Sequence, residues 1–395
     1  MHDCALQQRR PIDRAPESGF GPCLLARPPN PAASKAIFPL NAPLPSPLLY
    51  PHPTAPAIGR VIEVADGVFW LRMPLPFALD HINLWLLRDE IAGVKGWTVI
   101  DTGFGDAPTR AAWETHFAET MQGLPLLRVI VTHYHPDHIG NAEWLLQRVD
   151  GEPLAWMTLG EFSAAHLNWN QCVVEMKDFA AFFARHGMPN ELTAVQGERG
   201  NIYKIGVPTL PRQYRRLLTG DSVRIGQRDW RVIVGLGHAP EHASFYCPSI
   251  GVLIAGDMLL PRISTNVSVG PQDPEGDPLA LFLSSIGVYT RLSEDTLVLP
   301  SHGFPFIGIR PRVDALNEHH RARLAELQAA TSETDSVTAY GLLPVLFRRS
   351  LDTQQQFFAM GESIAHLNHL WHQRRLSRSI GRDSVIRFSS IRKEE

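Results

Sequence analysis

Four potential metal ligands stand close together in one short segment of this sequence: His133, His135, Asp137 and His138. His133 and His135 alternate along an extended segment, so both side chains can face the same side of the chain. Pro136 breaks this alternation, which leaves Asp137 and His138 free to face a second point nearby. Two imidazoles directed at one point and a carboxylate–imidazole pair directed at another suit two adjacent metal ions better than one.

The elements on either side of this segment predict how it is presented. An apolar run at residues 126–131 precedes it and predicts a buried strand, and a helix is expected to open at Gly140-Asn141. The ligands therefore lie between the carboxyl end of a strand and the start of a helix. This is the usual position of a binding site in an α/β sheet. The alternative is a solvated polar turn with unrelated histidines, which the density of ligands at this strand end disfavours.

Other apolar runs also end in residues of the same chemistry. These predicted strands are residues 97–100, 230–234, 252–255 and 297–300. The ligand-type residues that follow them are Asp101, His238, Asp257 and His302. His242 lies in the same loop as His238, and we predict that it hydrogen-bonds within that loop and binds no metal. Together with the segment at 133–138, these strand ends make coincidence a poor explanation.

The motifs DTG, HxHxDH, GHxPxH and the Gly-Asp pair at 256–257 follow one another in an order that resembles the metallo-β-lactamase superfamily. The resemblance implies an α/β fold, the αβ/βα four-layer sandwich, with a dinuclear metal centre. The first ion would be held by His133, His135 and His238, and the second by Asp137, His138 and His302. Asp257 would bridge both ions, and Asp101 would hold a ligand ring in one tautomer from behind. Asp101 could also be a turn residue that caps its own backbone, and the two roles do not exclude each other.

This ligand set also indicates a reaction type. Nitrogen and carboxylate ligands without cysteine are compatible with zinc, and also with iron or manganese. Two such ions polarise a carbonyl or phosphoryl group through its oxygen and lower the pKa of a bridging water, so that hydroxide is available at neutral pH. We expect two divalent ions, zinc first, and assign catalytic roles to Asp137 and Asp257. No GxSxG motif indicates a serine nucleophile, so the expected enzyme is a dinuclear metal-dependent hydrolase.

The expected substrate class follows from a resemblance to the glyoxalase-II-like branch of the superfamily. That branch has a single metal domain and lacks the inserted clamping domain of the nuclease relatives, which is not found here either. We therefore expect hydrolysis of a small acyl thioester or ester. The C-terminal region does not match the helical glutathione-binding extension of glyoxalase II. The sequence therefore does not indicate which thiol carries the acyl group. A lactonase and a nucleic-acid processing or binding protein are the alternatives.

The composition is that of an ordinary globular chain. Its 395 residues, 44% apolar and 19% charged, allow one large core or one core and a smaller module. The formal net charge of −3 gives no general attraction to nucleic acid or to an anionic membrane. The cysteines have no framework spacing, which favours a reducing compartment: Cys4, Cys23, Cys172 and Cys247. Without a run of eighteen apolar residues or a signal-peptide pattern, we expect a cytoplasmic location and no membrane contact.

Three regions are predicted along the chain. Residues 1–57 carry thirteen of the 32 prolines and are expected to form a disordered extension. Residues 58–310 contain all the motifs and form the expected metal domain, and residues 311–395 form a third region. Within the metal domain, residues 160–187 show bulky apolar side chains at helical spacing. This stretch predicts core packing, with a lid over the substrate cleft as the alternative.

The region 311–395 resembles the winged-helix-like module that some superfamily members carry. Its expected helices are 312–330, 337–347 and 354–371, followed by a β-wing at 377–391. Thr353 is the expected cap of the last helix. Seven basic residues and one acid lie between Arg374 and Lys393, which could bind phosphates, although a solvated surface is the commoner cause of such a run. We therefore expect a small-molecule acyl substrate and no nucleic-acid partner, and leave the oligomeric state open.

Overall fold

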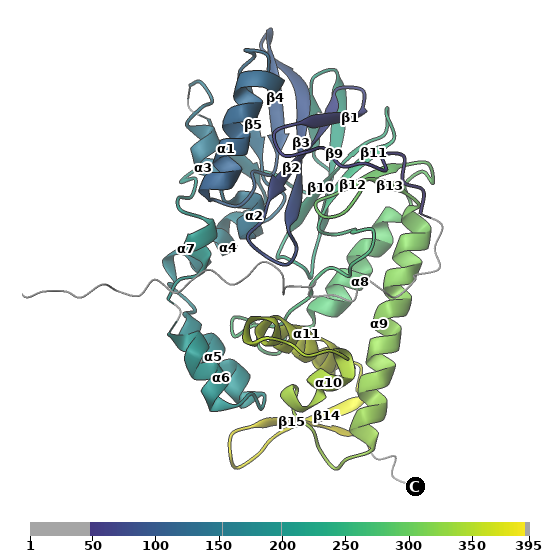
Figure 1. Cartoon of the computed structure of the whole chain (residues 1–395). Helices are drawn as coiled ribbons and strands as arrows, with labels where there is room; N and C mark the ends of the chain where they lie inside the picture. The colour runs from purple at the N-terminus through teal and green to yellow at the C-terminus, as the bar shows by residue number, and fades with distance from the viewer. Residues whose placement is uncertain (1–47, 152, 199, 392–395) are drawn as a thin grey trace, which may run out of the picture. The chain divides into compact units, whose positions relative to one another are not determined.

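The computed structural model describes residues 48–391 except 152 and 199, and its main part is a sandwich of two β-sheets (Figure 1). No helix in the described part of the chain is long and apolar enough to cross a membrane.

The first sheet has seven strands in the order β1 to β7. They are β1 (Val61–Ala65), β2 (Val68–Pro74), β3 (His81–Ile91), β4 (Val94–Ile100), β5 (Leu126–Ile130), β6 (Ala155–Met157) and β7 (Tyr214–Arg216). Neighbours from β1 to β4 pair antiparallel, and neighbours from β4 to β7 pair parallel. The turn between β1 and β2 is made by Asp66 and Gly67, and Gly67 adopts a φ of 73°, which glycine tolerates best.

The second sheet has six strands in the order β13-β12-β11-β10-β9-β8. They are β8 (Ser222–Ile225), β9 (Arg228–Gly235), β10 (His242–Cys247), β11 (Val252–Gly256), β12 (Leu297–Pro300) and β13 (Phe306–Ile307). β11 and β12 pair parallel, and the other neighbours pair antiparallel. The inner faces of the two sheets share one apolar core, to which Trp70 and Trp85 contribute from the first sheet and Trp230 and Phe245 from the second.

Helices cover the outer face of each sheet, which confirms the predicted four-layer αβ/βα sandwich (Figure 1). The helices on the first sheet are α1 (Ala107–Thr115), which continues into η1 (His116–Thr120), α2 (Pro136–Ile139), α3 (Ala142–Leu146) and α4 (Leu159–Asn170). The helices on the second sheet are α8 (Pro278–Tyr289) and α9 (Ile309–Ser332). Trp113 of α1 and Phe282 of α8 are fully buried in these two outer cores. Each sheet is therefore covered on both faces over its central strands.

Three further helices follow α4: α5 (Met176–Arg185), α6 (Asn190–Gly197) and α7 (Tyr203–Gly206). The helical stretch predicted at residues 160–187 corresponds to α4 and α5. Phe182 and Phe183 of α5 are buried in the core beside the second sheet, and Phe183 contacts Phe357 of α11 (Thr353–His372) with ring centroids 5.6 Å apart. Core packing is therefore confirmed for these two side chains.

The C-terminal region contains η2 (Tyr340–Leu342), α10 (Leu343–Leu346), α11 and a hairpin of β14 (Leu376–Ile380) and β15 (Ile386–Ser390). The predicted hairpin is confirmed, but the helix expected over residues 337–347 is wrong. Pro344 lacks the N–H that a continuous helix needs, so only the short η2 and α10 form. Val337 lies outside both and pairs with Phe388 of β15.

The cap of α11 also differs from the expectation. Asp352, not Thr353, is the N-cap residue, and its carboxylate accepts from Gln355 N at 2.8 Å. The Gln355 side chain returns a contact to the Asp352 N–H, which completes a capping box. Thr353 is therefore the first residue inside the helix, because the acidic side chain before it already satisfies the free N–H groups.

The chain joins the fold at an earlier residue than the sequence predicts. Residues 1–47 of the predicted extension lie outside the described residues. Leu49, however, forms a bridge with Ile307 of β13, with N···O distances of 3.1 and 2.9 Å. β13 is the edge strand of its sheet and has free backbone groups, whereas the prolines that follow Leu49 prevent a longer pairing. The start of order expected at Ile58 is therefore too late.

We predict that a chain starting at Leu48 is more stable than a chain starting at Ile58. The shorter chain loses the bridge at Leu49 and the packing of Leu48 and Tyr50 against the core. This loss should remove about 1–3 kcal/mol from the free energy of unfolding. Thermal or urea unfolding followed by circular dichroism measures the difference. Equal stabilities would show that residues 48–57 contribute nothing to the fold.

Candidate metal centre

The residues that the sequence singled out converge at one edge of the sandwich. β4 and β5 run parallel, β11 and β12 run parallel, and β9 runs in the direction of β11 because both are antiparallel to β10. The loops after the carboxyl ends of these strands therefore reach the same edge. They carry Asp101, His133, His135, Asp137, His138, His238, Asp257 and His302. The seven predicted ligands fall into two groups, and the ligand atoms within each group lie within 4.8 Å of one another.

The first group consists of His133, His135, His238 and Asp257. His133 Nε2 lies 2.9 Å from His135 Nδ1 and 3.2 Å from His238 Nε2. Asp257 Oδ2 lies 3.5 Å from His238 Nε2. Ring nitrogens that face one another at such distances repel unless a proton or a cation lies between them. This group therefore fits a metal ion.

The second group consists of Asp137, His138 and His302. Asp137 Oδ2 lies 3.5 Å from His302 Nε2 and 3.7 Å from His138 Nε2. The second oxygen of Asp257, Oδ1, also faces this group, at 3.5 Å from His302 Nε2 and 3.6 Å from His138 Nε2. Asp257 thus presents one carboxylate oxygen to each group, which is what a bridging carboxylate requires.

Asp101 orients the ring of His138 from behind. Its Oδ2 accepts from His138 Nδ1 and from Thr132 Oγ1, both at 2.8 Å, and its Oδ1 accepts from Thr132 N at 2.8 Å. Thr132 Oγ1 also lies 3.0 Å from His133 Nδ1, whose proton it can accept. Asp101 has a φ of 64°, a conformation that costs about 1–3 kcal/mol in a residue other than glycine, and these bonds offset it. In the described structure the carboxylate bonds none of its chain neighbours, so the self-capping alternative is wrong.

Backbone carbonyls orient two more rings. His238 Nδ1 donates to the carbonyl of Asn266 at 2.7 Å, and His302 Nδ1 donates to the carbonyl of His81 at 2.9 Å. Because Nδ1 carries a proton in each ring, Nε2 is the nitrogen left to bind a second proton or a cation. These Nε2 atoms are the ones that face the carboxylates of the two groups. Hydrogen bonds behind the rings therefore select the tautomer that binds a metal.

His242 belongs to neither group, as predicted, but its partner differs from the prediction. It is the first residue of β10, and its Nε2 accepts from the backbone N–H of Asp257 at 3.2 Å, not from a group in its own loop. Gly256 has a φ of 54°, and a Cβ at that position would lie 2.3 Å from His242 Nε2. Glycine is therefore required beside this ring, and the contact sets the direction in which Asp257 leaves β11.

Burial and charge favour different protonation states in the two groups. Burial lowers the pKa of His135 to about 3 and the pKa of His133 well below its usual value, so both rings are neutral donors. For His302, burial alone would lower the pKa, but the nearby carboxylates, Asp257 first, outweigh it and raise the pKa to about 10. The same balance raises the pKa of His138 well above its usual value. The second group therefore concentrates negative charge that attracts protons or metal cations.

Two buried atoms of the centre support the fit to metal ions. His138 Nε2 and Asp257 Oδ1 are buried and have no hydrogen-bond partner among the described residues. Such atoms are costly to leave unpaired, and a cation between them would satisfy both. The two groups are therefore consistent with a dinuclear metal site. Their nitrogen and oxygen donors do not distinguish zinc from iron or manganese.

The sequence prediction missed the residues that hold the loop of His302. Asn83 of β3 donates its backbone N–H to the carbonyl of Ser301 at 2.7 Å, and its side-chain Nδ2 donates to the carbonyl of Gly303 at 3.0 Å. Arg72 of β2 donates Nη2 to the same Gly303 carbonyl at 2.9 Å. Asn83 is fully buried and interrupts the apolar run at residues 82–87 of β3. A polar residue in such a place was the signal that could have indicated it.

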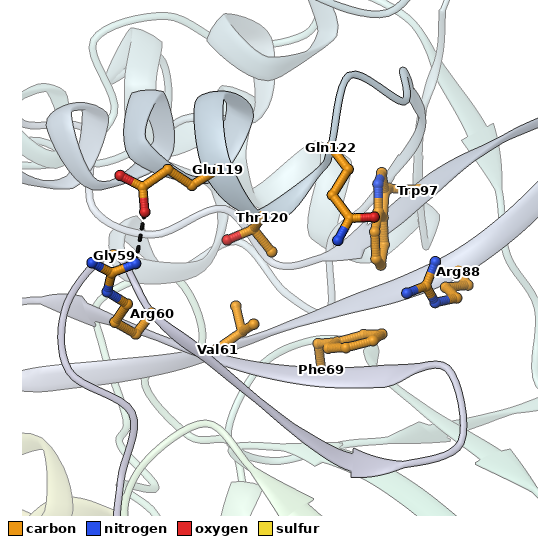
Figure 2. Close-up of a pocket in the computed structure, with 9 residues that line it drawn as sticks. All are labelled: Gly59, Arg60, Val61, Phe69, Arg88, Trp97, Glu119, Thr120 and Gln122. Carbon is orange, nitrogen blue, oxygen red and sulfur yellow. Dashed lines mark hydrogen bonds and ion pairs between the residues drawn. The ribbon is translucent and has the colours of Figure 1, made fainter.

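A cavity of about 280 Å³ lies away from the predicted ligands (Figure 2). Its lining includes Arg88 and Trp97, and an ion pair between Arg60 and Glu119 at 2.7 Å lies at one side. Trp97 belongs to the core on the outer face of the first sheet, and Glu119 and Thr120, which also line the cavity, belong to η1 on that face. None of the predicted ligands lines the cavity, and we assign it no part in the chemistry.

Sequence comparisons agree with this geometry. Residues 78–158 and 164–302, more than half of the chain, match the Metallo-beta-lactamase superfamily, and residues 324–391 match the Metallo-beta-lactamase-like C-terminal domain. The probable metallo-hydrolase YqjP of Bacillus subtilis is 23% identical over 313 residues, which cover 77% of this chain and 92% of that protein. A hydroxyacylglutathione hydrolase of Legionella pneumophila is 25% identical over 231 residues, which cover 58% of this chain and 66% of that protein.

Solved structures give the same result. A beta-lactamase domain protein from Burkholderia ambifaria is 50% identical, with a TM-score of 0.81 over 87% of this chain and 98% of that chain. A metallo-beta-lactamase family protein from Thermus thermophilus is 30% identical, with a TM-score of 0.68 over 83% of this chain and 100% of that chain. Because the superfamily match, these likenesses and the two groups of ligands coincide, the chain belongs to the metallo-β-lactamase superfamily and is a metallo-hydrolase.

Proposed function

We propose that this metallo-hydrolase cleaves a small acyl thioester or ester. The observation that carries the proposal is the position of Asp257, whose two oxygens face the two groups of ligands. A bridged pair of cations is suited to activate water for the attack on an acyl carbonyl. The thioester class is supported by the 25% identity to a protein named hydroxyacylglutathione hydrolase.

In this proposal each ion has three residues of its own and one that it shares. The first ion is bound by His133, His135 and His238, and the second by Asp137, His138 and His302. Asp257 bridges the two ions, and Asp101 holds His138 from behind. We propose zinc as the metal, with iron and manganese as the alternatives that the same donors allow.

The residues of the chain divide the work of hydrolysis among them. Two bound cations would supply a water of lowered pKa and would polarise the substrate carbonyl. Asp257 sets the separation of the two ligand groups because its carboxylate lies between them. The Asp137 side chain is 20% exposed, whereas His138 is fully buried, so the substrate approaches from the side of Asp137. There Asp137 can orient the attacking water and receive its proton.

Nucleic acid is the weaker alternative because arginines of the C-terminal hairpin are already engaged within the protein. Arg378 forms an ion pair with Glu275 at 2.6 Å and stacks on Trp371. Arg387 forms an ion pair with Asp383 at 2.6 Å. Charges that are paired in this way release fewer counterions on contact with phosphates than free ones. A lactonase would use the same centre, so only an assay with lactone and thioester substrates distinguishes the two activities.

We predict that zinc-loaded protein hydrolyses acyl-glutathione or acyl-CoA faster than a lactone and does not cleave single-stranded RNA. Metal analysis should give close to two transition-metal ions per chain, and chelation should remove these ions and the activity together. A folded protein that binds no transition metal would contradict the dinuclear centre. Two bound ions with RNA cleavage and no thioester turnover would contradict the substrate class alone.

We also predict that Asp257→Ala lowers activity more than Asp101→Ala. Asp257 contacts both groups, whereas Asp101 orients one ring, and the loss of such an orienting residue typically lowers metal affinity or activity about 10–100-fold. The measurements are metal content and kcat/KM of both variants, prepared with the same metal loading. Equal metal content and equal rates would reverse the two assignments.

A further inference from the structure

Tyr134 stands between His133 and His135, and both of its backbone polar groups are held by helices that carry no predicted ligand. Its N–H donates to Glu161 Oε2 of α4 at 2.8 Å, and its carbonyl accepts from the Tyr203 hydroxyl of α7 at 2.5 Å. α4 and α7 contact each other, and α7 contacts α2, which contains Asp137 and His138 (Figure 1). The chain between the two histidines is therefore fixed by helices that lie outside the two sheets.

The other oxygen of Glu161 holds a second ligand loop. Oε1 accepts from the backbone N–H of Glu241 at 2.6 Å, and Glu241 is three residues after His238. A reciprocal hydrogen bond is formed by the Glu241 carboxylate, whose Oε2 accepts from Gly160 N at 2.8 Å. A Cβ at Gly160 would lie 2.9 Å from Glu241 Cγ, so a larger residue at position 160 would displace the Glu241 side chain. One carboxylate thus joins the loop of His133 and His135 to the loop of His238.

This carboxylate would be unfavourable in the interior without those bonds. Glu161 is fully buried, and burial raises its pKa to about 7, while the N–H groups of Glu241 and Tyr134 favour the ionised form. Hydrogen bonds to a charged acceptor are shorter and stronger than neutral ones. A buried acid that only filled space could be replaced by an apolar side chain without loss. Both oxygens of Glu161 instead accept hydrogen bonds from backbone N–H groups near histidines of the first group.

We propose that Glu161 and Tyr203 are positioning residues for the first metal ion, because they set the separation between the loop of His133 and His135 and the loop of His238. The inference rests on the ligand set of the proposed function. It assigns the helical segment from α4 to α7 a part in metal binding that its packing alone does not require.

Glu161→Gln tests the inference, because glutamine keeps the shape but has a single acceptor oxygen for two N–H donors. The zinc dissociation constants of the full chain are measured by competition with a chromophoric chelator, in the absence of substrate. We expect one of the two ions to bind about 10–100-fold more weakly and the other to be unchanged. Tyr203→Phe, which removes only the hydroxyl, should weaken the same ion by less.

Asp89→Asn is the matched control. Asp89 is also a buried carboxylate that accepts two backbone N–H groups, from Glu90 at 2.8 Å and Gly226 at 2.6 Å, and it contacts Arg128 at 3.3 Å. It lies eight positions along β3 from His81, roughly 26 Å away. This variant should lower the unfolding temperature and leave both zinc affinities at the wild-type value.

The outcomes separate the inference from the proposed function. Wild-type affinity for both ions in Glu161→Gln, or an equal loss in Asp89→Asn, would overturn the inference and leave the proposed function intact. If Glu161→Gln does not fold, Tyr203→Phe decides, and unchanged affinities in that variant overturn the inference as well. A wild-type protein that binds no zinc would overturn the proposed function itself.

Discussion

Hydrogen bonds that cross from one sheet to the other at their carboxyl edge keep the metal centre assembled. The carbonyl of Thr132, directly before the predicted ligand His133, accepts from the N–H of Ala243 in β10 at 2.9 Å. The N–H of Asn83 in β3 donates to the carbonyl of Ser301, directly before the predicted ligand His302, at 2.7 Å. Because the predicted ligands come from both sheets, any slip of one sheet against the other would separate them. The close-packed tryptophan-rich core between the sheets opposes such a slip, and these bonds set the register at the site itself.

The charge distribution of the centre explains why it is costly to build and why it suits cations. Imidazoles and carboxylates are brought together in a buried place, where unbalanced charge is unfavourable. Burial alone would raise the pKa of Asp257, but His302 and His138 outweigh it and hold that pKa well below its usual range. The backbone of Asp101 is held in a left-handed conformation at the same time. The rest of the fold offsets these unfavourable features, and a divalent cation would relieve the charge imbalance.

The C-terminal region contributes to the centre through the loop between β11 and α8. In this loop the carbonyl of Asn266 orients His238, and three residues further along the N–H of Val269 donates to the carbonyl of Gly361 in α11 at 3.1 Å. α11 also donates from Asn368 Nδ2 to the carbonyl of Gly276 at 3.0 Å. α11 therefore braces the loop that orients a predicted metal ligand. This contact gives the C-terminal region a structural role that does not depend on binding any partner.

Local order in the sequence determined the strands that precede the site and the ligand-type residues at their ends, because strand period and imidazole spacing are written within a few residues. The resemblance of those motifs to a known superfamily implied the helix–sheet–sheet–helix architecture. The helix expected over residues 337–347 was wrong because its apolar pattern was given more weight than Pro344, which interrupts the helix. Tertiary structure alone decided that Leu49 pairs with β13, that Asn83 anchors the loop of a ligand and that Glu161 joins two ligand loops. Each of these contacts links residues 27 to 258 positions apart in the chain. A hydrogen bond over such a separation leaves no periodic pattern in the sequence, so only the folded chain, which brings both partners to one place, could reveal it.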